Sequence, residues 1–434
     1  MGIKKIIATT LLATSMLTLA GCAKGKASEE VNSDNPTTSS DKLVMAIWDT
    51  NQLNGIQEIV NGFTEETGVE VDIQVTPWTQ YWTMLEAGAT GGELPDVFWM
   101  HSNEFAKYAQ YDMLLDLTDR IEESEKIDLE NYPKEIVDLY NWNNEKQFAV
   151  PKDIDTIALW YNKTMFDEAG LEYPNADWTW DDFKEAAKKL TKSDGSQYGY
   201  TLSPSDNQEG WYNMVYSMGG AIISDDRKTS KMDDPNTIKA IEYASSFVKE
   251  GLTPKYEIIA ENGAESLFKS GKVAMIPQGS WMVSDLMSND YVKENADVAV
   301  LPKDATTGKR ISIYNGLGWT ASANTKSPDN AWKLIEYLTS KDAQQKQSDL
   351  GVTMSAYDGT SDNWKDLHPE INLQAYLDMK ENLVIRPYSK STVIWENYVS
   401  EKLIDVWTGT MSAEDACKEI ANKMNELLKN EEQN

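Results

Sequence analysis

Histidine and cysteine are scarce in this chain of 434 residues, which holds two of each. His101 and His368 are far apart in the sequence, so they lack the short spacing of metal ligands on one helix. No G-x-S-x-G motif supports a serine nucleophile beside His101. Cys22 and Cys417 are too few to build a disulfide framework. We therefore expect no metal site, no cofactor and no catalytic residues.

Basic residues are also few relative to acidic ones. Forty Lys and Arg stand against 70 Asp and Glu, which gives a formal net charge of −30. Loss of Lys4 and Lys5 with an N-terminal signal would bring the charge to −32. A protein this acidic is repelled by phosphate backbones and by anionic lipid surfaces. Nucleic acid is therefore not an expected partner.

Long apolar runs are missing apart from one near the N-terminus. The run from Ile6 to Ala20 is short for a membrane span and is broken by Thr and Ser. Together with Lys4 and Lys5 it has the layout of an export signal, which we place at residues 1–21. The segment ending in Cys22 resembles a bacterial lipobox, in which that thiol is joined to diacylglycerol. The alternative is an ordinary secretory signal with an incidental cysteine.

Residues 22–41 are rich in Ser, Glu, Asn and Thr and have almost nothing to bury, so they predict a flexible tether. A lipid anchor of this kind retains a protein at a membrane without inserting it. We expect the protein on the outer face of the cytoplasmic membrane, in contact with it through the anchor alone. The long tether suits a Gram-positive surface.

The remaining residues are too many for one ordinary core, which predicts two lobes. The first begins with an apolar strand at 43–48, a helix with its apolar face at Ile56, Ile59, Val60 and Phe63, and an alternating strand at 69–75. This order predicts a right-handed βαβ unit. A helix at 79–88 and a strand at 96–100 follow. The first lobe is therefore expected to be α/β.

Later segments indicate how the chain passes between the lobes. Residues 148–162 are extended and interrupted by Pro151, which indicates a crossing. Beyond it we expect helices at 180–191, 208–219, 235–250 and 263–270, extended segments at 272–277, 297–302 and 310–322, and an almost wholly helical tail from 328. The lobes would comprise 42–150 with about 313–355, and 151–312 with about 356–434.

Aromatic residues are plentiful, with 15 Trp and 20 Tyr. Several stand at the ends of expected strands, where ligands bind in open parallel sheets. They are Trp48, Trp78, Trp99 and Trp281. Flat apolar sugar faces stack on aromatic rings, while sugar hydroxyls bind Asp, Asn, His and Arg. The alternative is that these rings close the ends of the sheets.

Five segments in order resemble the family 1 extracellular solute-binding proteins of carbohydrate ABC transporters, the group that includes maltose-binding protein. They are GGELPDVFWM (91–100), VPKDIDTIALWYNKTMFDEAGL (150–171), WTWDDFKEAAKKLT (178–191), IPQGSWM (276–282) and YNGLGWTASANTKSPDNAWKLIEYLTS (314–340). The resemblance covers essentially the whole chain after the tether. It implies a two-lobed α/β fold of the type II periplasmic-binding-protein class, with a mainly parallel sheet in each lobe and a hinged cleft. It also implies a monomer that closes on an oligosaccharide and delivers it to a permease.

The resemblance further implies which side chains contact the ligand. These candidates are Trp48, Asp49, Trp78, His101, Asp155, Trp211, Trp281, Asn315, Gly316, Arg386 and Trp395. Three other tryptophans, at 178, 180 and 332, accompany helix starts or amphipathic faces and are expected to be structural.

Three other functions were weighed. A lipid-anchored glycoside hydrolase or lyase needs two carboxylates across the scissile bond, and a chain with 70 acidic residues neither proves nor forbids such a pair. The run from Gly316 to Ala321 matches a dinucleotide fingerprint, but no helix is expected to open directly after it. A surface adhesin or peptide-binding module would instead need a large exposed apolar patch.

Overall fold

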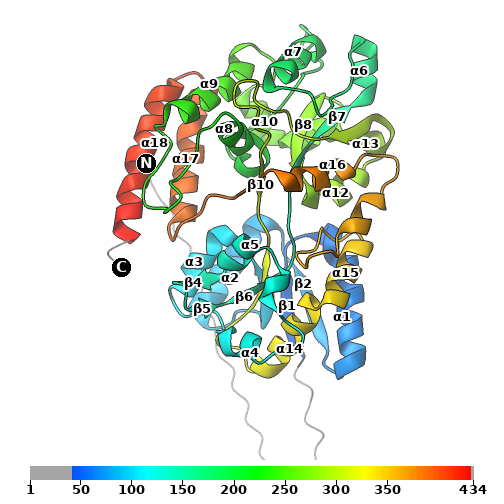
Figure 1. Ribbon diagram of the computed structural model, residues 1–434, viewed down its shortest axis with the longest axis vertical. Helices are drawn as coiled ribbons and strands as arrows, with labels where there is room; N and C mark the ends of the chain where they lie inside the picture. Colours follow the sequence, from blue (N-terminus) through cyan, green and yellow to red (C-terminus); the bar gives the residue numbers. More distant parts are fainter. Residues whose placement is uncertain (1–41, 432–434) are drawn as a thin grey trace, which may run out of the picture. The chain divides into compact units, whose positions relative to one another are not determined.

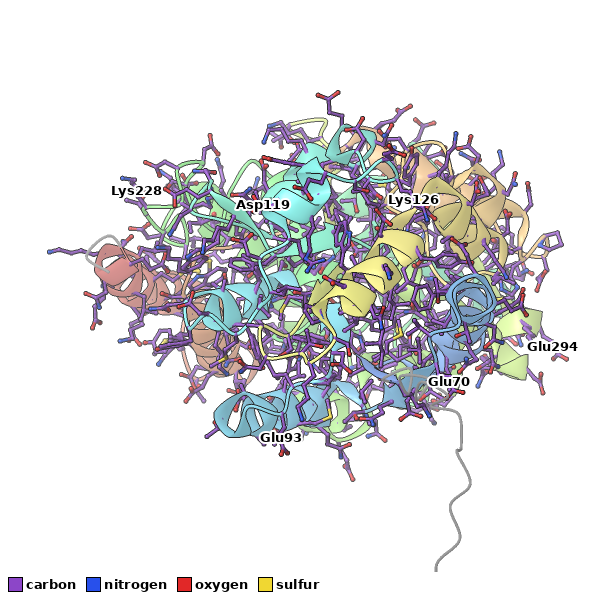
Figure 2. All side chains as sticks on the ribbon, turned by 90° about the horizontal axis from the view of Figure 1, so that it is seen from below. Glu70, Glu93, Asp119, Lys126, Lys228 and Glu294 are labelled. Atoms are coloured by element: carbon purple, nitrogen blue, oxygen red, sulfur yellow. The ribbon has the colours of Figure 1, made fainter. Side chains whose placement is uncertain are left out.

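The computed structural model describes residues 42–431 (Figure 1). The expected signal peptide, the lipid attachment at Cys22 and the tether lie outside the described residues. No helix within 42–431 is both long and apolar enough to cross a bilayer. Charged side chains such as Glu70, Glu93, Asp119 and Glu294 project from the periphery (Figure 2).

The first lobe is built on a five-stranded sheet with the order β2-β1-β3-β11-β6. Its strands are β1 (Leu43–Ile47), β2 (Val71–Val75), β3 (Val97–Met100), β6 (Ala149–Pro151) and β11 (Gly318–Ala321). β1 pairs in parallel with both β2 and β3, as the predicted βαβ unit requires. β11 runs antiparallel between β3 and β6. A segment far along the chain thus completes the first sheet.

Alternation along β1 divides the core between the two faces of this sheet. Leu43, Met45 and Ile47 pack on one face, together with the helices that follow β1 and β11, whereas Ala46 packs on the other. The predicted apolar face of α1 (Leu53–Thr67) is buried against the first of these faces. α1 ends at Gly68, whose positive φ of 73° favours glycine.

The other elements of the first lobe are short apart from α2 and α14. They are η1 (Thr50–Gln52), α2 (Trp78–Gly91), α3 (Ser102–Ala109), α4 (Thr118–Glu122), η2 (Leu129–Asn131), α5 (Lys134–Asp138), β4 (Asn141–Trp142), β5 (Lys146–Gln147), α14 (Pro328–Thr339) and α15 (Lys341–Asp349).

The second lobe contains a three-stranded sheet with the order β8-β7-β9. β7 (Ile157–Asn162) is antiparallel to both β8 (Met275–Gly279) and β9 (Ala296–Ala299). The expectation of a mainly parallel sheet is therefore wrong for this lobe. The antiparallel register puts Gly279 opposite Ile157, so β8 ends beside the point where the chain enters the lobe. Side chains that follow β8 are delivered to the junction of the lobes.

Helices cover this sheet, and the long pair α17 and α18 lie side by side (Figure 1). The elements are α6 (Lys163–Ala169), α7 (Trp180–Leu190), η3 (Asn207–Trp211), α8 (Tyr212–Ser217), α9 (Pro235–Lys249), α10 (Tyr256–Asn262), α11 (Ala264–Lys269), η4 (Ser280–Met282), α12 (Val283–Met287), α13 (Asp290–Asn295), α16 (Gln374–Asp378), η6 (Met379–Glu381), α17 (Thr392–Trp407) and α18 (Ala413–Glu431).

The tail is less helical than expected. Between α15 and α17 the chain forms loops, the short helix η5 (Asp362–Asp366), α16, η6 and the strand β12 (Leu383–Ile385). β12 pairs in parallel with β10 (Ser312–Tyr314). Gly351 and Gly359 have positive φ, 70° and 76°, and interrupt the helical run. This return of the chain brings Arg386 to the junction.

Three extended segments cross between the lobes side by side. The backbone N–H of Lys152 donates to the Leu317 carbonyl over 2.7 Å, and that of Asp155 donates to the Asn315 carbonyl over 3.0 Å. The Ile154 N–H donates to the Met354 carbonyl over 3.1 Å. The predicted crossing at 148–162 is thus joined on both sides by later parts of the chain.

Candidate functional site

A cavity of about 620 Å³ lies where the crossing segments meet both lobes. Seven of the predicted contacts line it: Trp48, Asp49, Trp78, His101, Asp155, Trp281 and Arg386. Its size is that of an ordinary small-molecule pocket. The structure therefore brings together residues that are more than 300 positions apart in the sequence.

Tryptophans build the first-lobe wall of the cavity. The Trp48 ring follows β1 and meets the Trp78 ring edge to face, with centroids 5.0 Å apart. Trp82 and Trp99 pack against Trp48 at 5.8 and 4.9 Å and hold it in place. Trp78 is 43% exposed, a large exposure for an aromatic side chain. The wall presents apolar ring surface that a flat apolar ligand could cover.

Trp281 lines the cavity from the second lobe. It stands in η4, directly after β8, and is half-buried against the core of that lobe. A Cβ atom at Gly279 would lie 2.0 Å from the Trp281 ring, so this ring position requires glycine at 279. Aromatic surface is consequently available on both sides of the cavity.

His101, which follows β3, links the first-lobe wall of the cavity to the crossing segment that contains Asn315. Its Nδ1 accepts from the Asn103 N–H at the start of α3, over 3.2 Å. Its Nε2 lies 3.1 Å from the Asn315 side-chain amide. Burial lowers the pKa of His101 well below its usual value, and the nearby charge of Arg386 lowers it further. His101 is therefore neutral at physiological pH.

A buried ion pair lies beneath the cavity floor. The Lys152 ammonium has no exposed surface and lies 2.7 Å from an Asp153 carboxylate oxygen. It also donates to Gln52 over 3.0 Å and lies 4.6 Å from the Trp99 ring centroid. The second Asp153 oxygen accepts from the Leu317 N–H over 2.7 Å. This pair joins η1 to two of the crossing segments.

Asp155 lies in the crossing segment, where the chain enters the second lobe, and hydrogen bonds fix its side chain. One of its oxygens accepts from the Gln208 side chain over 2.7 Å and from the Asn315 N–H over 2.9 Å. Burial raises the pKa of Asp155 well above its usual value, and the neighbouring charge of Asp153 adds to this effect. Asp155 can accordingly act as a hydrogen-bond donor or acceptor toward a ligand.

Arg386 is 5% exposed and is held by Glu396 of α17, whose two oxygens lie 2.8 and 2.9 Å from its Nη2. Tyr212 and Asn207 also donate to Glu396, over 3.1 and 3.2 Å. The Asn103 side chain reaches Glu396 from the first lobe over 2.7 Å. The Nε and Nη1 atoms of Arg386 are buried without a partner among the described residues. Arg386, which lines the cavity, therefore keeps two N–H donors that no described residue accepts.

Two predicted contacts are wrong. Trp211 and Trp395 are fully buried in the core of the second lobe, and neither lines the cavity. The Trp211 indole N–H donates to the Pro204 carbonyl, and that of Trp395 donates to the Ser389 hydroxyl. Their helices turn these rings inward, so they cannot stack on a ligand in the cavity.

Asn315 and Gly316 lie behind the cavity rather than on its surface. Asn315 is 1% exposed and positions His101 and Asp155. A Cβ atom at Gly316 would lie 2.2 Å from the Asp153 carbonyl oxygen, so glycine is required where the crossing strands meet. Trp180 and Trp332 are buried, and Trp178 packs against the core, in agreement with the structural role expected of them.

Several polar lining residues were not anticipated from the sequence. They are Asn51, Gln52, Asn103, Asp153, Ser205, Asn207, Gln208, Glu209, Glu265, Lys269, Ser280, Asp285 and Thr353. Most stand in ordinary polar segments that carry no local signature. Only the Asp-Asn-Gln-Glu run at 206–209, just before a buried Trp, could have attracted attention.

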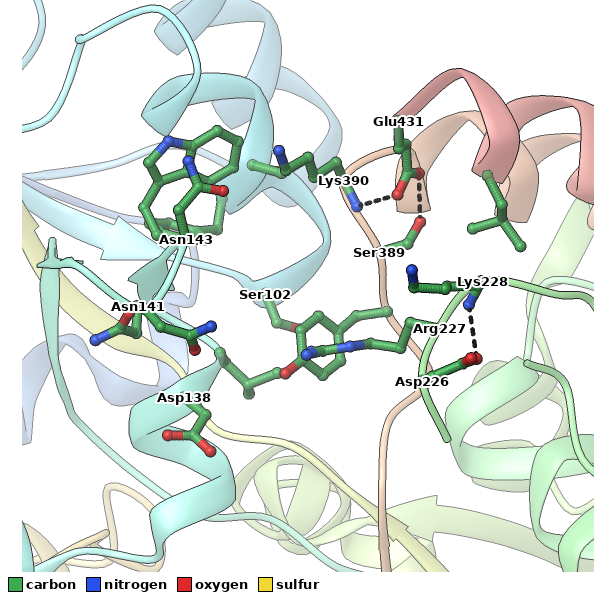
Figure 3. A pocket seen from close by; sticks show the side chains of 17 residues that line it. Ser102, Asp138, Asn141, Asn143, Asp226, Arg227, Lys228, Ser389, Lys390 and Glu431 are labelled. Atoms are coloured by element: carbon green, nitrogen blue, oxygen red, sulfur yellow. Dashed lines mark hydrogen bonds between the residues drawn. The ribbon is translucent and has the colours of Figure 1, made fainter. Parts of the chain in front are cut away.

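A second hollow of about 320 Å³ is lined by residues of α3, of β4 and of the loops at 226–228 and 388–390 (Figure 3). The Lys390 ammonium lies 4.8 Å from the Trp142 ring centroid, and the Arg227 guanidinium lies 4.3 Å from the Tyr388 ring centroid. The Trp142 and Tyr388 rings are thus already in contact with cationic side chains of the protein itself, through cation–π interactions. None of the predicted contacts lines this hollow, so we place the candidate site in the larger cavity.

Comparisons with known sequences relate the chain to binding proteins. The family model for bacterial extracellular solute-binding proteins matches residues 48–345. The galactooligosaccharide-binding protein of Bacillus subtilis is 27% identical over 349 residues, which cover 78% of this chain and 77% of that protein. The multiple sugar-binding protein of Streptococcus mutans is 22% identical over 378 residues, 83% of this chain and 84% of that protein. A binding protein of Brucella abortus is 29% identical, but the match spans only 48% of its length.

Solved structures show the same two-lobed architecture. An ABC substrate-binding protein of Listeria monocytogenes in complex with cycloalternan superposes with a TM-score of 0.81 at 24% identity, over 89% of this chain and 98% of that chain. Maltose-bound MalE3 of T. maritima superposes with a TM-score of 0.74 at 21% identity, over 89% and 99% of the two chains. At these identities the likeness establishes the fold alone.

Proposed function

The chain belongs to the bacterial extracellular solute-binding protein family, and from this premise we propose that it captures an oligosaccharide in the larger cavity and delivers it to the permease of an ABC importer. The observation that carries the proposal is the pair of aromatic surfaces, Trp48 with Trp78 on one lobe and Trp281 on the other. Sugar rings would stack between them, and hydroxyls would bind Asp155 and the unused donors of Arg386.

Binding would proceed by closure of the two lobes about the crossing segments. A ligand that contacts both lobes favours the closed state by the difference in its affinity for the two states. The moving units we propose are residues 42–150 with about 313–355, and 151–312 with about 356–434. The protein would act as a monomer, and the permease would recognise the closed form.

No chemical step is needed for this function. Members of the family bind substrates and are not enzymes, and the similar proteins of Bacillus subtilis and Streptococcus mutans are named as sugar-binding proteins. The glycan-degrading alternative has no observation in its favour. The dinucleotide-like run at 316–321 includes β11 and is not followed directly by a helix that could hold a pyrophosphate, because the next helix, α14, begins at Pro328.

The proposal is tested by a thermal-shift screen of residues 41–434 against neutral oligosaccharides of different linkage and length. Ligand that binds only the folded state raises the midpoint of unfolding. Stabilisation by one series, with the sugar recovered intact, supports a receptor. Cleaved sugar would identify an enzyme instead, and no shift with any saccharide would remove the carbohydrate from the proposal.

Replacing Trp281 with alanine should weaken binding of the stabilising oligosaccharide at least tenfold, which corresponds to about 1.4 kcal/mol. The loss arises because one face of the sugar would no longer stack. Since Trp281 is half-buried, some loss of unfolding free energy should accompany the change. Trp178→Ala is the matched control, because Trp178 packs against the same core but does not line the cavity. Equal affinity losses in both variants, measured by calorimetry, would contradict a stacking role.

We also propose that Cys22 carries the lipid anchor and holds the protein at the outer face of a Gram-positive membrane. The proposal is supported by the lipobox-like residues before Cys22 and by membership of an extracellular family. Cys22→Ser should move the full-length protein from the membrane fraction to the medium. Retention of this variant in the membrane fraction, measured by immunoblotting, would refute the anchor.

A further inference from the structure

We infer that the larger cavity selects uncharged saccharides and rejects acidic ones, because carboxyl groups outnumber basic groups in its lining and each nearby base is already paired. The inference rests on the proposed function and names the substrate class of the same site. Six acidic side chains line the cavity, against two basic ones, Lys269 and Arg386. The acidic residues are Asp49, Asp153, Asp155, Glu209, Glu265 and Asp285.

The positive charges at the cavity are compensated within the protein. Lys269 lies 2.7 Å from the carboxylate of Asp285. Arg386 lies 2.8 Å from Glu396. Lys152, beneath the floor, lies 2.7 Å from Asp153. A carboxylate on a ligand would therefore have to displace an existing carboxylate partner to gain a full ion pair.

The second-lobe wall, by contrast, carries two carboxyl groups that have no paired base among the described residues. Glu209 and Glu265 form no ion pair with any base in residues 42–431. Burial, together with the charge of the adjacent Asp206, raises the pKa of Glu209 to about 8, so Glu209 becomes mostly ionised only above about pH 8. The charge of Glu265 raises the pKa of both Asp206 and Glu209. A ligand carboxylate brought beside Glu265, or beside Glu209 above about pH 8, would be repelled.

The unused donors of Arg386 do not offset this repulsion. Glu396 already takes both short contacts of Nη2, so most of the guanidinium charge is compensated within the protein. Asp155 and Glu209 also lie within the field of Arg386, which lowers the pKa of each. Nε and Nη1 remain as directional N–H donors, which suit the oxygen of a neutral hydroxyl.

The experiment compares sugars that differ only in charge. Two pairs serve as probes: galactotriose with trigalacturonate, and maltotriose with its C6-oxidised triuronate. Affinities are measured by calorimetry on residues 41–434 at low and high salt. The neutral member of a pair should bind at least tenfold more tightly than the acidic member, and added salt should narrow the gap because the repulsion is screened.

Variants locate the charge responsible. Glu265→Gln at about pH 7, and Glu209→Gln above about pH 8 where Glu209 is ionised, should each reduce the ratio of neutral to acidic affinity at least tenfold. Glu261→Gln is the matched control, since it removes the same charge from an exposed position on α10 that does not line the cavity. A reduction equal to that of the control would overturn the assignment to Glu209 and Glu265.

Two other outcomes also test the proposed selectivity for uncharged saccharides. Binding of the acidic member to the unmodified protein as tightly as the neutral one would overturn the selectivity while leaving saccharide binding intact. Failure of every neutral and acidic saccharide to bind would overturn both the selectivity and the proposed function. Thermal midpoints of all variants show whether each is folded.

Discussion

Lys152→Met is expected to lower the free energy of unfolding by about 3 to 5 kcal/mol, because it leaves Asp153 as a buried charge without its partner. The ammonium of Lys152 is fully buried, and the Asp153 side chain is 7% exposed. The substitution also removes the donor to Gln52 and the cation beside Trp99. Urea unfolding followed by tryptophan fluorescence measures the change.

Two further variants separate charge from packing in this experiment. Adding Asp153→Asn to Lys152→Met should recover most of the loss, since the amide oxygen can still accept from the Leu317 N–H and no charge is left buried. Lys189→Met is the control on the exposed face of α7, where changes stay within about 0.5 kcal/mol. If Lys152→Met cost no more than this control, the ion pair would not stabilise the crossing.

Arg386→Met should have two separable effects. It removes the unused donors at the cavity, and the loss of a hydrogen bond from a charged group weakens ligand binding by about 1.5 to 3 kcal/mol. It also strips Glu396 of its partner in a buried setting, which lowers the free energy of unfolding by about 3 kcal/mol or more. Calorimetry with the stabilising oligosaccharide and urea unfolding measure the two effects.

The double variant Arg386→Met, Glu396→Gln distinguishes these contributions. Stability should largely return, because no charge is left unpaired, whereas the affinity should stay low because the donors are still missing. Recovery of both quantities would mean that Arg386 only supports the fold. Recovery of neither would point to a packing defect at position 386.

The stability of Arg386→Met should also depend on pH. Burial already raises the pKa of Glu396 in the folded protein, and loss of the arginine charge would raise it further. Since the carboxyl ionises at lower pH when unfolded, the stability of the variant should fall as pH rises above about 4.5. The deficit relative to the unmodified protein should be larger at about pH 8 than at about pH 5.

The local pattern of apolar residues correctly predicted the helices and strands that bury a single face. The helical spacing of Ile56, Ile59, Val60 and Phe63 and the alternating strand after it led directly to the parallel unit of the first sheet. The same holds for α7 and α9, which begin and end close to where the sequence places them. The periodicity of apolar residues is enough to predict these elements, because each of them buries a single face against a single hydrophobic core.

The predictions from the sequence failed for features that depend on contacts between residues far apart in the chain. The orientation of β7 relative to its neighbours depends on how the chain returns after more than 100 residues, and no local residue specifies it. The family resemblance implied that Trp211 and Trp395 contact the ligand, yet their helices turn the rings into the core. Glu396 was not singled out, although it holds Arg386.

By itself the sequence determined the small numbers of histidine and cysteine, the two lobes and the placement of Trp48, Trp78 and Trp281 at strand ends. These features depend on composition and on neighbours a few residues away. Only the tertiary structure decided which aromatic rings reach the cavity and which charges pair beneath it. Arg386 and Glu396 are only 10 positions apart, but Asn103 reaches Glu396 from 293 positions away, and this contact forms only when the lobes and the crossing segments are in place.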